Sequence, residues 1–350
     1  MLSSIFSVLP YRLKRKRIGP VRAVDLTRFR IHHNIEPLGE KQMKGLDLAE
    51  AYYDTHGAPM ISGRFGDAAH RIATGFVGPG SECFGFDDKI SRDHDWGPGF
   101  CIWLPAADCD RFGADLQKAY ENLPATFMGF GPRKVSPGEQ RRTGVVKISE
   151  FYRTYTGLDH VPATLGEWLN IPESSLATCT NGKIFTDPLG EFSRWRKALL
   201  DFYPEDVRLK KLASRCFTIA QTGQYNFTRS LKRKEFFAAQ YSETQFCADV
   251  ISLIFLLNKR YAPFYKWMHR AVMQLPLLGK EIHALISGLM ACRACNEKPS
   301  IIEKICTLIT SALQTEGLSD ATSNFLLDHA YRIHDRIEDR DLRTQFSVIN

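Results

Sequence analysis

The second half of the chain is dominated by apolar residues that recur with helical spacing through six successive segments. Short links with proline or glycine separate most of them, as at Ala262-Pro263, Leu275-Pro276 and Glu316-Gly317. Apolar residues repeated about every 3.6 positions are typical of helices that bury one face against their neighbours. The sequence therefore predicts an all-α helical bundle over residues 201–350, with helices at 206–222, 235–259, 263–274, 280–294, 301–314 and 320–336.

The preceding part, residues 44–200, has a different pattern. Short apolar segments bounded by glycine or proline predict strands at 73–78, 100–104 and 145–148. Segments with helical spacing alternate with these strands, at 44–55, 67–72 and 108–122. Such an alternation is typical of a small sheet covered by helices. The expected fold class is therefore α+β, with a small mixed-sheet domain followed by the helical bundle.

The net charge of +7 is concentrated near the N-terminus. Residues 1–45 contain ten basic and three acidic side chains, which accounts for the whole excess, and the other 305 residues are neutral overall. A nucleic-acid-binding domain usually carries its basic groups on the folded body, so this distribution disfavours a long nucleic acid as partner. It predicts a basic, flexible N-terminal extension over residues 1–43. A transit peptide, a nuclear-import cluster and an arm for anionic surfaces stay open as its role.

Neither a membrane span nor a disulfide framework is expected from the sequence. The longest apolar run, Ile251–Leu257, is far shorter than the roughly 18–20 residues that cross a bilayer. The positive charges near the N-terminus follow the first apolar residues, whereas a secretory signal has them in front. The nine cysteines are an odd number scattered along the chain, which favours free thiols. We therefore expect a cytoplasmic protein.

A glycine-rich turn with a serine, Gly78-Pro79-Gly80-Ser81, follows the first predicted strand. Glycines allow backbone N–H groups to converge on an anion, and a hydroxyl group can add another donor. Gly80 and Ser81 are therefore candidate contacts for the phosphates of a nucleotide.

Two acids, Asp93 and Asp95, follow Ser81 after a spacer of eleven residues. If this segment is extended, the alternation of a strand places both carboxylates on one face and directs His94 to the interior. Like charges held together need a cation between them, and Mg²⁺ prefers oxygen ligands that it shares with substrate phosphates. The pattern predicts a magnesium site at Asp93 and Asp95, beside the glycine turn.

The order of Gly80-Ser81, the spacer and Asp93-His94-Asp95 resembles the signature of the polymerase-β-type nucleotidyltransferase superfamily. The fuller stretch 80–100 is similar to an uncharacterised bacterial family of that superfamily, known as a domain of unknown function. The helical half is similar to the bundle of kanamycin-type nucleotidyltransferases. The likeness covers about residues 45–280 and includes the segments 187–192, 203–207, 223–226 and 264–267.

This resemblance implies a magnesium-dependent nucleotidyltransferase. Such an enzyme moves a nucleoside monophosphate from a nucleoside triphosphate, with ATP as the expected donor, to an acceptor hydroxyl or amine. A small-molecule acceptor is favoured over a protein or the end of a tRNA. Asp93 and Asp95 would hold Mg²⁺, Gly80 and Ser81 would bind the phosphates, and the helical half would supply the acceptor pocket.

The sequence departs from the superfamily pattern in two places. His94 stands where an apolar residue is usual, and the third metal-binding acid is not obvious. Glu150, just after the third predicted strand, is the main candidate for this acid, ahead of Glu167 and Asp187. The unclear third acid keeps open a non-catalytic nucleotide-binding module. A sugar transferase that uses Asp-x-Asp ranks last, because it would need a longer α/β domain.

Basic side chains outside the turn provide further candidate nucleotide contacts, namely Arg92, Lys210 and Lys266. In the helical half, cations beside aromatic rings can hold a triphosphate and stack a base. The alternative is an amphipathic helix whose lysines and arginines are simply solvated. We expect Asp87 and Asp88 to form a turn rather than to belong to the site.

Overall fold

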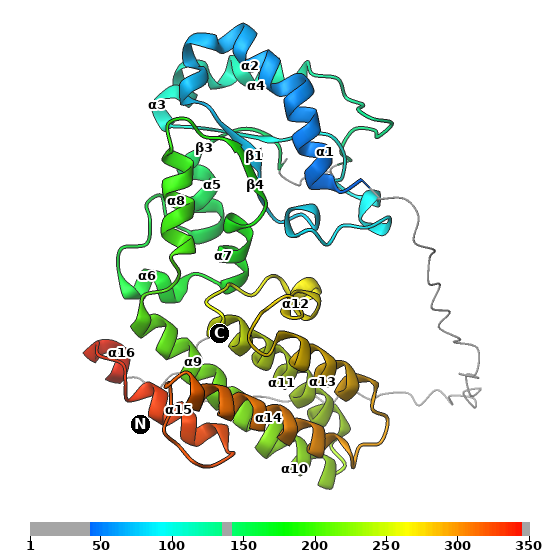
Figure 1. Ribbon diagram of the computed structural model, residues 1–350, viewed down its shortest axis with the longest axis vertical. Coiled ribbons are helices and arrows are strands. Elements are labelled where there is room, and N and C mark those ends of the chain that lie inside the picture. The colour runs from blue at the N-terminus through cyan, green and yellow to red at the C-terminus, as the bar shows by residue number, and fades with distance from the viewer. Residues whose placement is uncertain (1–42, 135–141, 345–350) are drawn as a thin grey trace, which may run out of the picture. The chain divides into compact units, whose positions relative to one another are not determined.

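The computed structural model describes residues 43–134 and 142–344. These residues belong to one compact unit that begins at Met43. The predicted basic extension therefore lies outside the described residues, apart from its last residue. The fold class is α+β, as predicted: a small mixed sheet with helices on both faces, followed by a group of helices (Figure 1).

The sheet has four strands in the order β3-β2-β1-β4. Strand β1 pairs antiparallel with both β2 and β4, whereas β2 pairs parallel with β3. The three strands predicted from the sequence are present, and the fourth was not predicted. Their bounds are Ala73–Phe76 for β1, Cys101–Leu104 for β2, Gly144–Lys147 for β3 and Lys183–Thr186 for β4.

Strand β4 escaped prediction because it begins with Lys183 and ends with Thr186, both of which are exposed. Its place in the sheet depends on Gly75 in β1. A Cβ atom on Gly75 would lie 2.5 Å from the Lys183 carbonyl oxygen, so a larger residue would push the two strands apart. The close approach of β4 to β1 therefore requires a glycine at position 75.

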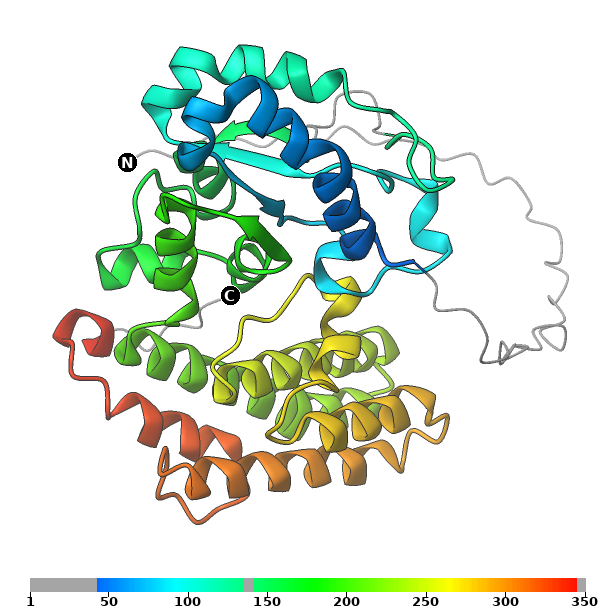
Figure 2. The same cartoon turned by 45° about the horizontal axis from the view of Figure 1, so that its top comes forward.

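The central strand β2 is apolar along its whole length because helices cover both faces of the sheet (Figures 1 and 2). On one face, Ile102 and Leu104 pack with α1, α2 and α4. On the other face, the ring of Trp103 stacks on Phe192 of α8 at a centroid distance of 3.8 Å. The helices are α1 Gly45–Tyr52, α2 Ala58–Phe65, α3 Ala106–Asp108, α4 Ala114–Glu121, α5 Ile148–Thr156, α6 Leu165–Asn170, α7 Glu173–Thr180 and α8 Glu191–Leu200.

The remainder of the described chain is helical, as predicted. The long helix α11 is buried around most of its circumference, in accordance with its nearly continuous apolar sequence from Ile251 to Leu257. A more widely wound π-helical segment, Ala220–Phe227, prolongs α9 beyond its predicted end. The helices are α9 Glu205–Ile219, α10 Thr228–Lys232, α11 Phe236–Leu257, α12 Tyr265–Val272, α13 Gly279–Ala291, α14 Lys298–Thr315, α15 Leu326–His334 and α16 Arg340–Thr344.

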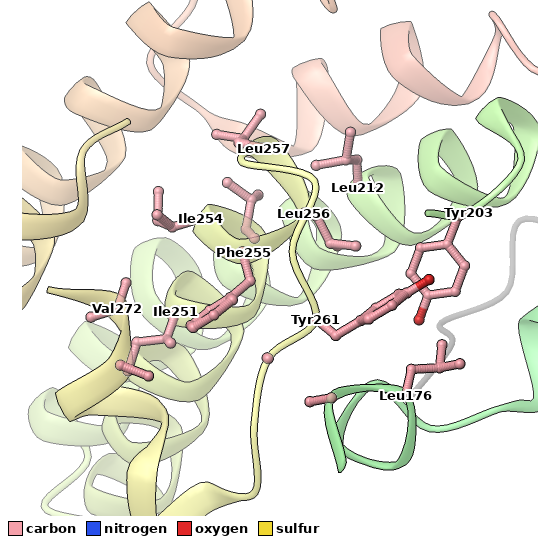
Figure 3. Close-up of a cluster of buried hydrophobic side chains, with 14 of the residues drawn as sticks. Leu176, Tyr203, Leu212, Ile251, Ile254, Phe255, Leu256, Leu257, Tyr261 and Val272 are labelled. Atoms are coloured by element: carbon pink, nitrogen blue, oxygen red, sulfur yellow. The ribbon is translucent and has the colours of Figure 1, made fainter. Parts of the chain in front are cut away.

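The helices that follow the sheet share a hydrophobic core with it. In Figure 3, Tyr261, on the extended segment after α11, points toward Tyr203, and Leu176 of α7 lies next to them. The rings of Tyr203 and Tyr261 meet edge to face at 5.1 Å, and the Tyr261 hydroxyl donates a 2.6 Å hydrogen bond to the Leu199 carbonyl. This contact fixes the start of the α11–α12 link against the sheet-bearing part.

All nine cysteines lie in the described part of the chain and are free thiols. Among the helices of the described ranges, none combines the length and the apolar character needed to cross a lipid bilayer.

Candidate functional site

The glycine turn after β1 is held from the side by Asn181, the residue that follows α7. The Gly78 amide donates to the Asn181 side-chain oxygen at 3.0 Å, and the Asn181 amide group donates to the Gly78 carbonyl at 2.7 Å. Gly78 has a φ of +151°, which glycine adopts far more readily than other residues. The turn predicted from the sequence is thus present, and its first residue, Gly78, is anchored to the end of α7.

Asp95 meets this turn through a buried cluster of two acids and two arginines. Arg142 donates from Nε to the Asp95 carboxylate and from Nη2 to Glu82 at 3.1 Å. Arg133 bridges the same two acids, with its Nη1 atom 3.1 Å from Glu82 Oε1 and 3.4 Å from Asp95 Oδ1. The four side chains are between 2 % and 16 % exposed. We call these four residues the arginine–acid cluster.

Gly80 lies directly against the arginine–acid cluster. A Cβ atom at this position would overlap both the Arg142 guanidinium group and the Glu82 carboxylate. The sequence predicted Gly80 as a phosphate contact. The structure adds a second reason for a glycine there: a side chain would displace Arg142 and Glu82. Ser81 next to it is half-buried, and its carbonyl oxygen accepts hydrogen bonds from Phe84 and Phe86.

The opposite charges of the arginine–acid cluster stabilise one another. Burial alone would lower the pKa of Arg142, but the neighbouring Glu82 and Asp95 carboxylates outweigh it and raise that pKa. Three guanidinium nitrogens of the cluster are buried and have no hydrogen-bond partner in the described ranges: Arg133 Nε, Arg133 Nη2 and Arg142 Nη1. Buried donors of this kind are unusual, and an anion can satisfy them.

The acid pair does not have the extended geometry that the sequence suggested. Asp93 is exposed and ends a 3₁₀ helix, Ile90–Asp93, and Asp95 has a φ of +42°. The chain therefore bends between them, and the strand alternation that would place both carboxylates on one face is absent. The expectation that His94 faces the interior is also wrong, because His94 is exposed.

Asp93 and Asp95 in this arrangement do not fit a magnesium site. Both oxygens of the Asp95 carboxylate already face arginine nitrogens, and Asp93 takes no part in these contacts. Across residues 43–134 and 142–344, no three His, Cys, Asp or Glu side chains gather closely enough to hold a metal ion. A cation would have to displace Arg142 to reach Asp95.

The two acids expected to form a turn behave differently from each other. Asp88 accepts hydrogen bonds from the amides of Ile90 and Ser91, so its role in a turn is confirmed. Asp87 is buried, and its Oδ2 atom accepts from the Gly45 amide at 2.8 Å and from Trp96 Nε1 at 3.2 Å. Asp87 thus ties the start of α1 to the segment that carries the acid pair.

Arg92 lies on the outer side of the same segment. Its guanidinium group stacks over the rings of Trp96 at 4.6 Å and Phe130 at 5.1 Å, and it donates to the Met43 carbonyl. None of these contacts involves the glycine turn. A nucleotide contact by Arg92 stays a prediction.

The three candidates for the third acid lie apart from Asp95. Glu150 is on α5, half exposed, with its carboxylate 3.9 Å from Lys147, and it borders a cavity of about 760 Å³ that Arg142 also borders. Glu167 caps the start of α6 by accepting from the Thr164 amide. Asp187 accepts hydrogen bonds from backbone amides at the start of α8. The last two therefore have structural uses, and only Glu150 shares a cavity with the cluster.

The two lysines predicted to contact the nucleotide are in different surroundings. Lys210 is buried under α15 and α16, where its ammonium group donates to the Leu342 carbonyl at 2.7 Å, and burial lowers its pKa. Lys266 is exposed on α12, with its ammonium 5.4 Å from the centre of the Trp267 ring. Of the two, only Lys266 lies close to the segment that follows the glycine turn, because the Trp267 ring is 5.1 Å from Phe84.

Sequence reasoning missed Glu82, Arg133 and Arg142. Glu82 directly follows the glycine turn, but neither arginine has a local signal, since Arg133 and Arg142 lie 38 and 47 positions after Asp95. Arg270, which belongs to the cations beside aromatic rings in the helical half, donates a 3.0 Å hydrogen bond to the Phe86 carbonyl and so holds the segment after the turn on α12.

Comparison with known proteins gives one match. A family model described as a domain of unknown function, DUF4037, matches residues 168–268. This range runs from α6 into α12 and does not include the glycine turn or the acid pair. No curated protein and no solved structure matches the chain.

Proposed function

We propose that the protein is a nucleotidyltransferase that moves a nucleoside monophosphate from a nucleoside triphosphate, with ATP as the first candidate, to a small acceptor. The acceptor oxygen or nitrogen would bond to the α-phosphorus as the bond to the bridging oxygen breaks. Pyrophosphate would leave, and the acceptor proton would pass to a base. The resemblance described above suggests this reaction, and one structural relationship supports it.

That relationship is the convergence of the glycine turn and Asp95. The two features are separated by more than ten residues, yet Arg142 contacts the Asp95 carboxylate and also fills the space beside Gly80. One of the three unpaired guanidinium nitrogens of the arginine–acid cluster, Arg142 Nη1, lies beside Gly80. A triphosphate is a trianion or tetraanion, so donors beside a glycine turn are suited to it.

Within this proposal, the described side chains bind and orient the donor. Arg133 and Arg142 would pair with phosphate oxygens, and Gly80 would let the phosphates approach the backbone. Mg²⁺ is implied by the resemblance alone, and we assign no step to it, because Asp95 is held by arginines and Asp93 is exposed and takes no part in these ion pairs.

A second candidate function is a nucleotide-binding module without catalysis. The specific observation in its favour is that both oxygens of the Asp95 carboxylate are engaged by Arg133 and Arg142. In such a module Asp95 and Glu82 would offset the charge of the two arginines until phosphate oxygens replace them, and neither acid would touch a metal ion.

The test is calorimetry of the full chain with the four ribonucleoside triphosphates, with and without Mg²⁺, together with an assay for pyrophosphate release. The variants are Asp95→Asn and, as a matched control, Asp115→Asn on the exposed face of α4. For a transferase we expect triphosphate binding and slow pyrophosphate release, both reduced at least about tenfold in Asp95→Asn, because Arg142 loses the carboxylate that holds it beside the glycine turn. The control should behave as the wild type.

The binding module predicts the opposite change in triphosphate affinity for the same variant. Asp95→Asn removes a negative charge that competes for the two arginines, so triphosphate affinity should stay the same or rise, with no pyrophosphate release. Absence of binding to all four triphosphates, with and without Mg²⁺, would refute both functions.

A further inference from the structure

A cavity of about 370 Å³ lies between the segment that follows the glycine turn and the link between α11 and α12. Its volume falls within the range of roughly 300–1,000 Å³ that small-molecule sites occupy. Side chains from both parts of the fold form its walls. Those used below are Phe86, Asn181, Phe255, Lys259, Arg260 and Ala271.

Aromatic rings form part of the wall of this cavity, and contacts within the fold hold them in place. Phe202 stacks on Tyr261 at 4.9 Å, and the Tyr261 hydroxyl is occupied by its hydrogen bond to the Leu199 carbonyl. Phe86 and Phe255 are 6 % and 5 % exposed. A flat apolar ring can therefore pack against rigid rings without first ordering them, which lowers the entropic cost of binding.

The only charged side chains that line the cavity, among the residues the structure describes, are Lys259 and Arg260. Both are exposed, and neither has an ion-pair partner in the described ranges. They follow the C-terminus of α11, and a helix end alone would favour cations there. The helix end does not account for their position beside a cavity that several aromatic rings line and to which no acidic side chain of the described ranges contributes.

The same cavity is connected to the proposed nucleotide site. Asn181, one of its lining residues, holds Gly78 by two hydrogen bonds, and Phe86 lies on the segment that Arg270 fastens to α12. A molecule in the cavity would therefore lie against the chain segment that also carries Gly80 and Ser81.

We propose that this cavity binds a small aromatic carboxylic acid, with the ring between the aromatic walls and the carboxylate paired with Arg260 and Lys259. Two cations match one carboxylate better than a triphosphate, which needs more donors. That this acid is the acceptor rests on the proposed function above. Its binding does not, because no nucleotide takes part in these contacts.

The experiment measures binding of benzoate, 1-naphthoate and indole-3-carboxylate to the full chain by ligand-observed NMR and calorimetry. The neutral analogue 1-naphthalenemethanol is the comparison for the charge. We expect 1-naphthoate to bind at least about tenfold more tightly than the alcohol. Arg260→Gln should remove most of this difference and leave the alcohol unaffected.

Two further variants locate the site. Lys280→Gln replaces an exposed lysine at the start of α13 that does not line the cavity, and it should leave all affinities unchanged. Ala271→Phe fills the cavity from α12 and should abolish binding of both acid and alcohol. Thermal unfolding of each variant shows whether it is folded, and Arg260→Gln carries the test if Ala271→Phe is not.

The proposal is overturned if all three acids bind more weakly than about 1 mM, a free energy of only about 4 kcal/mol. It is also overturned if acid and alcohol bind equally, or if Arg260→Gln and Lys280→Gln behave alike. Competition with ATP distinguishes a nucleotide from an aromatic carboxylic acid as the ligand of the cavity. If ATP displaces 1-naphthoate competitively, the cavity is a nucleotide site and the proposal fails. Naphthoate binding without any triphosphate binding would refute the proposed function and leave the cavity assignment intact.

Discussion

Arg142 holds Asp95 at two points, donating from Nε to its carboxylate and from Nη2 to its backbone carbonyl oxygen 2.6 Å away. The bond to the backbone fixes the bend of the chain at Asp95, and the bond to the side chain compensates its charge. Because the same guanidinium group also reaches Glu82, one side chain joins the glycine turn to the segment that leads into β2.

We expect Arg142→Gln to lower the free energy of unfolding by about 3 kcal/mol, since loss of one partner leaves buried acids incompletely compensated. Arg133 remains and limits the loss. Urea denaturation followed by circular dichroism measures the change. Arg153→Gln is the matched control, because Arg153 on α5 is 61 % exposed and pairs only with Asp159 among the described residues. A loss below about 1 kcal/mol for Arg142→Gln, typical of a surface pair, would contradict this role.

Gly80→Ala should destabilise the protein by about 1–3 kcal/mol, because the new methyl group would overlap Arg142 and Glu82 in a filled space. Gly63→Ala is the comparison: Gly63 lies within α2, and nothing approaches a Cβ atom there within 4 Å. That change should stabilise by about 0.5–1 kcal/mol through helix propensity. Thermal unfolding of both variants provides the test, and equal behaviour of the two would show that Gly80 is not confined by the cluster.

Trp267→Leu should loosen the segment after the glycine turn, because it removes the ring contact with Phe84. An aromatic pair is worth about 0.5–1.5 kcal/mol beyond its buried area, so amide exchange in residues 82–86 should become about 3- to 10-fold faster. Hydrogen–deuterium exchange with mass spectrometry measures this rate. Phe237→Leu, at a side chain that is 84 % exposed on α11, should leave the rate unchanged.

An unchanged exchange rate in Trp267→Leu would mean that the hydrogen bond from Arg270 to Phe86 is sufficient to hold the segment. Arg270→Gln would then have to produce the acceleration on its own.

The elements that the sequence predicted correctly are those whose signal is local. Strand β2 is apolar through Ile102, Trp103 and Leu104, and α11 is apolar throughout its last two turns, so each can be recognised from adjacent residues. Strand β4 has a weaker signal, because its apolar residues are limited to Ile184 and Phe185 between the exposed Lys183 and Thr186.

The candidate site also shows that only features with a local sequence signal could be predicted. The glycine turn and Asp95 were found from their order in the sequence, but the geometry of the acid pair was not. Asp95 adopts a positive φ and is held by Arg133 and Arg142, which are remote in the sequence. Period-2 alternation applies only to an extended segment, and nothing local shows that distant arginines will bend this one.

Stability at low pH should depend on Glu167, which lies in the first turn of α6. The amides of Ala163 and Thr164 and the ring of His160 hydrogen-bond its carboxylate and lower its pKa to about 2. A carboxyl group in an unfolded chain has a pKa of about 4.3. Because the folded value is the lower one, the stabilisation is fully present above about pH 4.3 and is lost as the pH falls toward about 2.

Glu167→Gln should therefore lower the melting temperature at pH 7, and the gap to the wild type should narrow between pH 4.5 and pH 3. Melting curves at pH 7, 4.5 and 3 measure this gap. Glu316→Gln, at an exposed residue after α14, should show no such pH dependence. A difference in melting temperature that stays constant or widens toward pH 3 would contradict this prediction. It would show that the capping amides do not favour the ionised carboxylate, because only a lowered pKa of Glu167 makes the wild type lose its extra stability in acid.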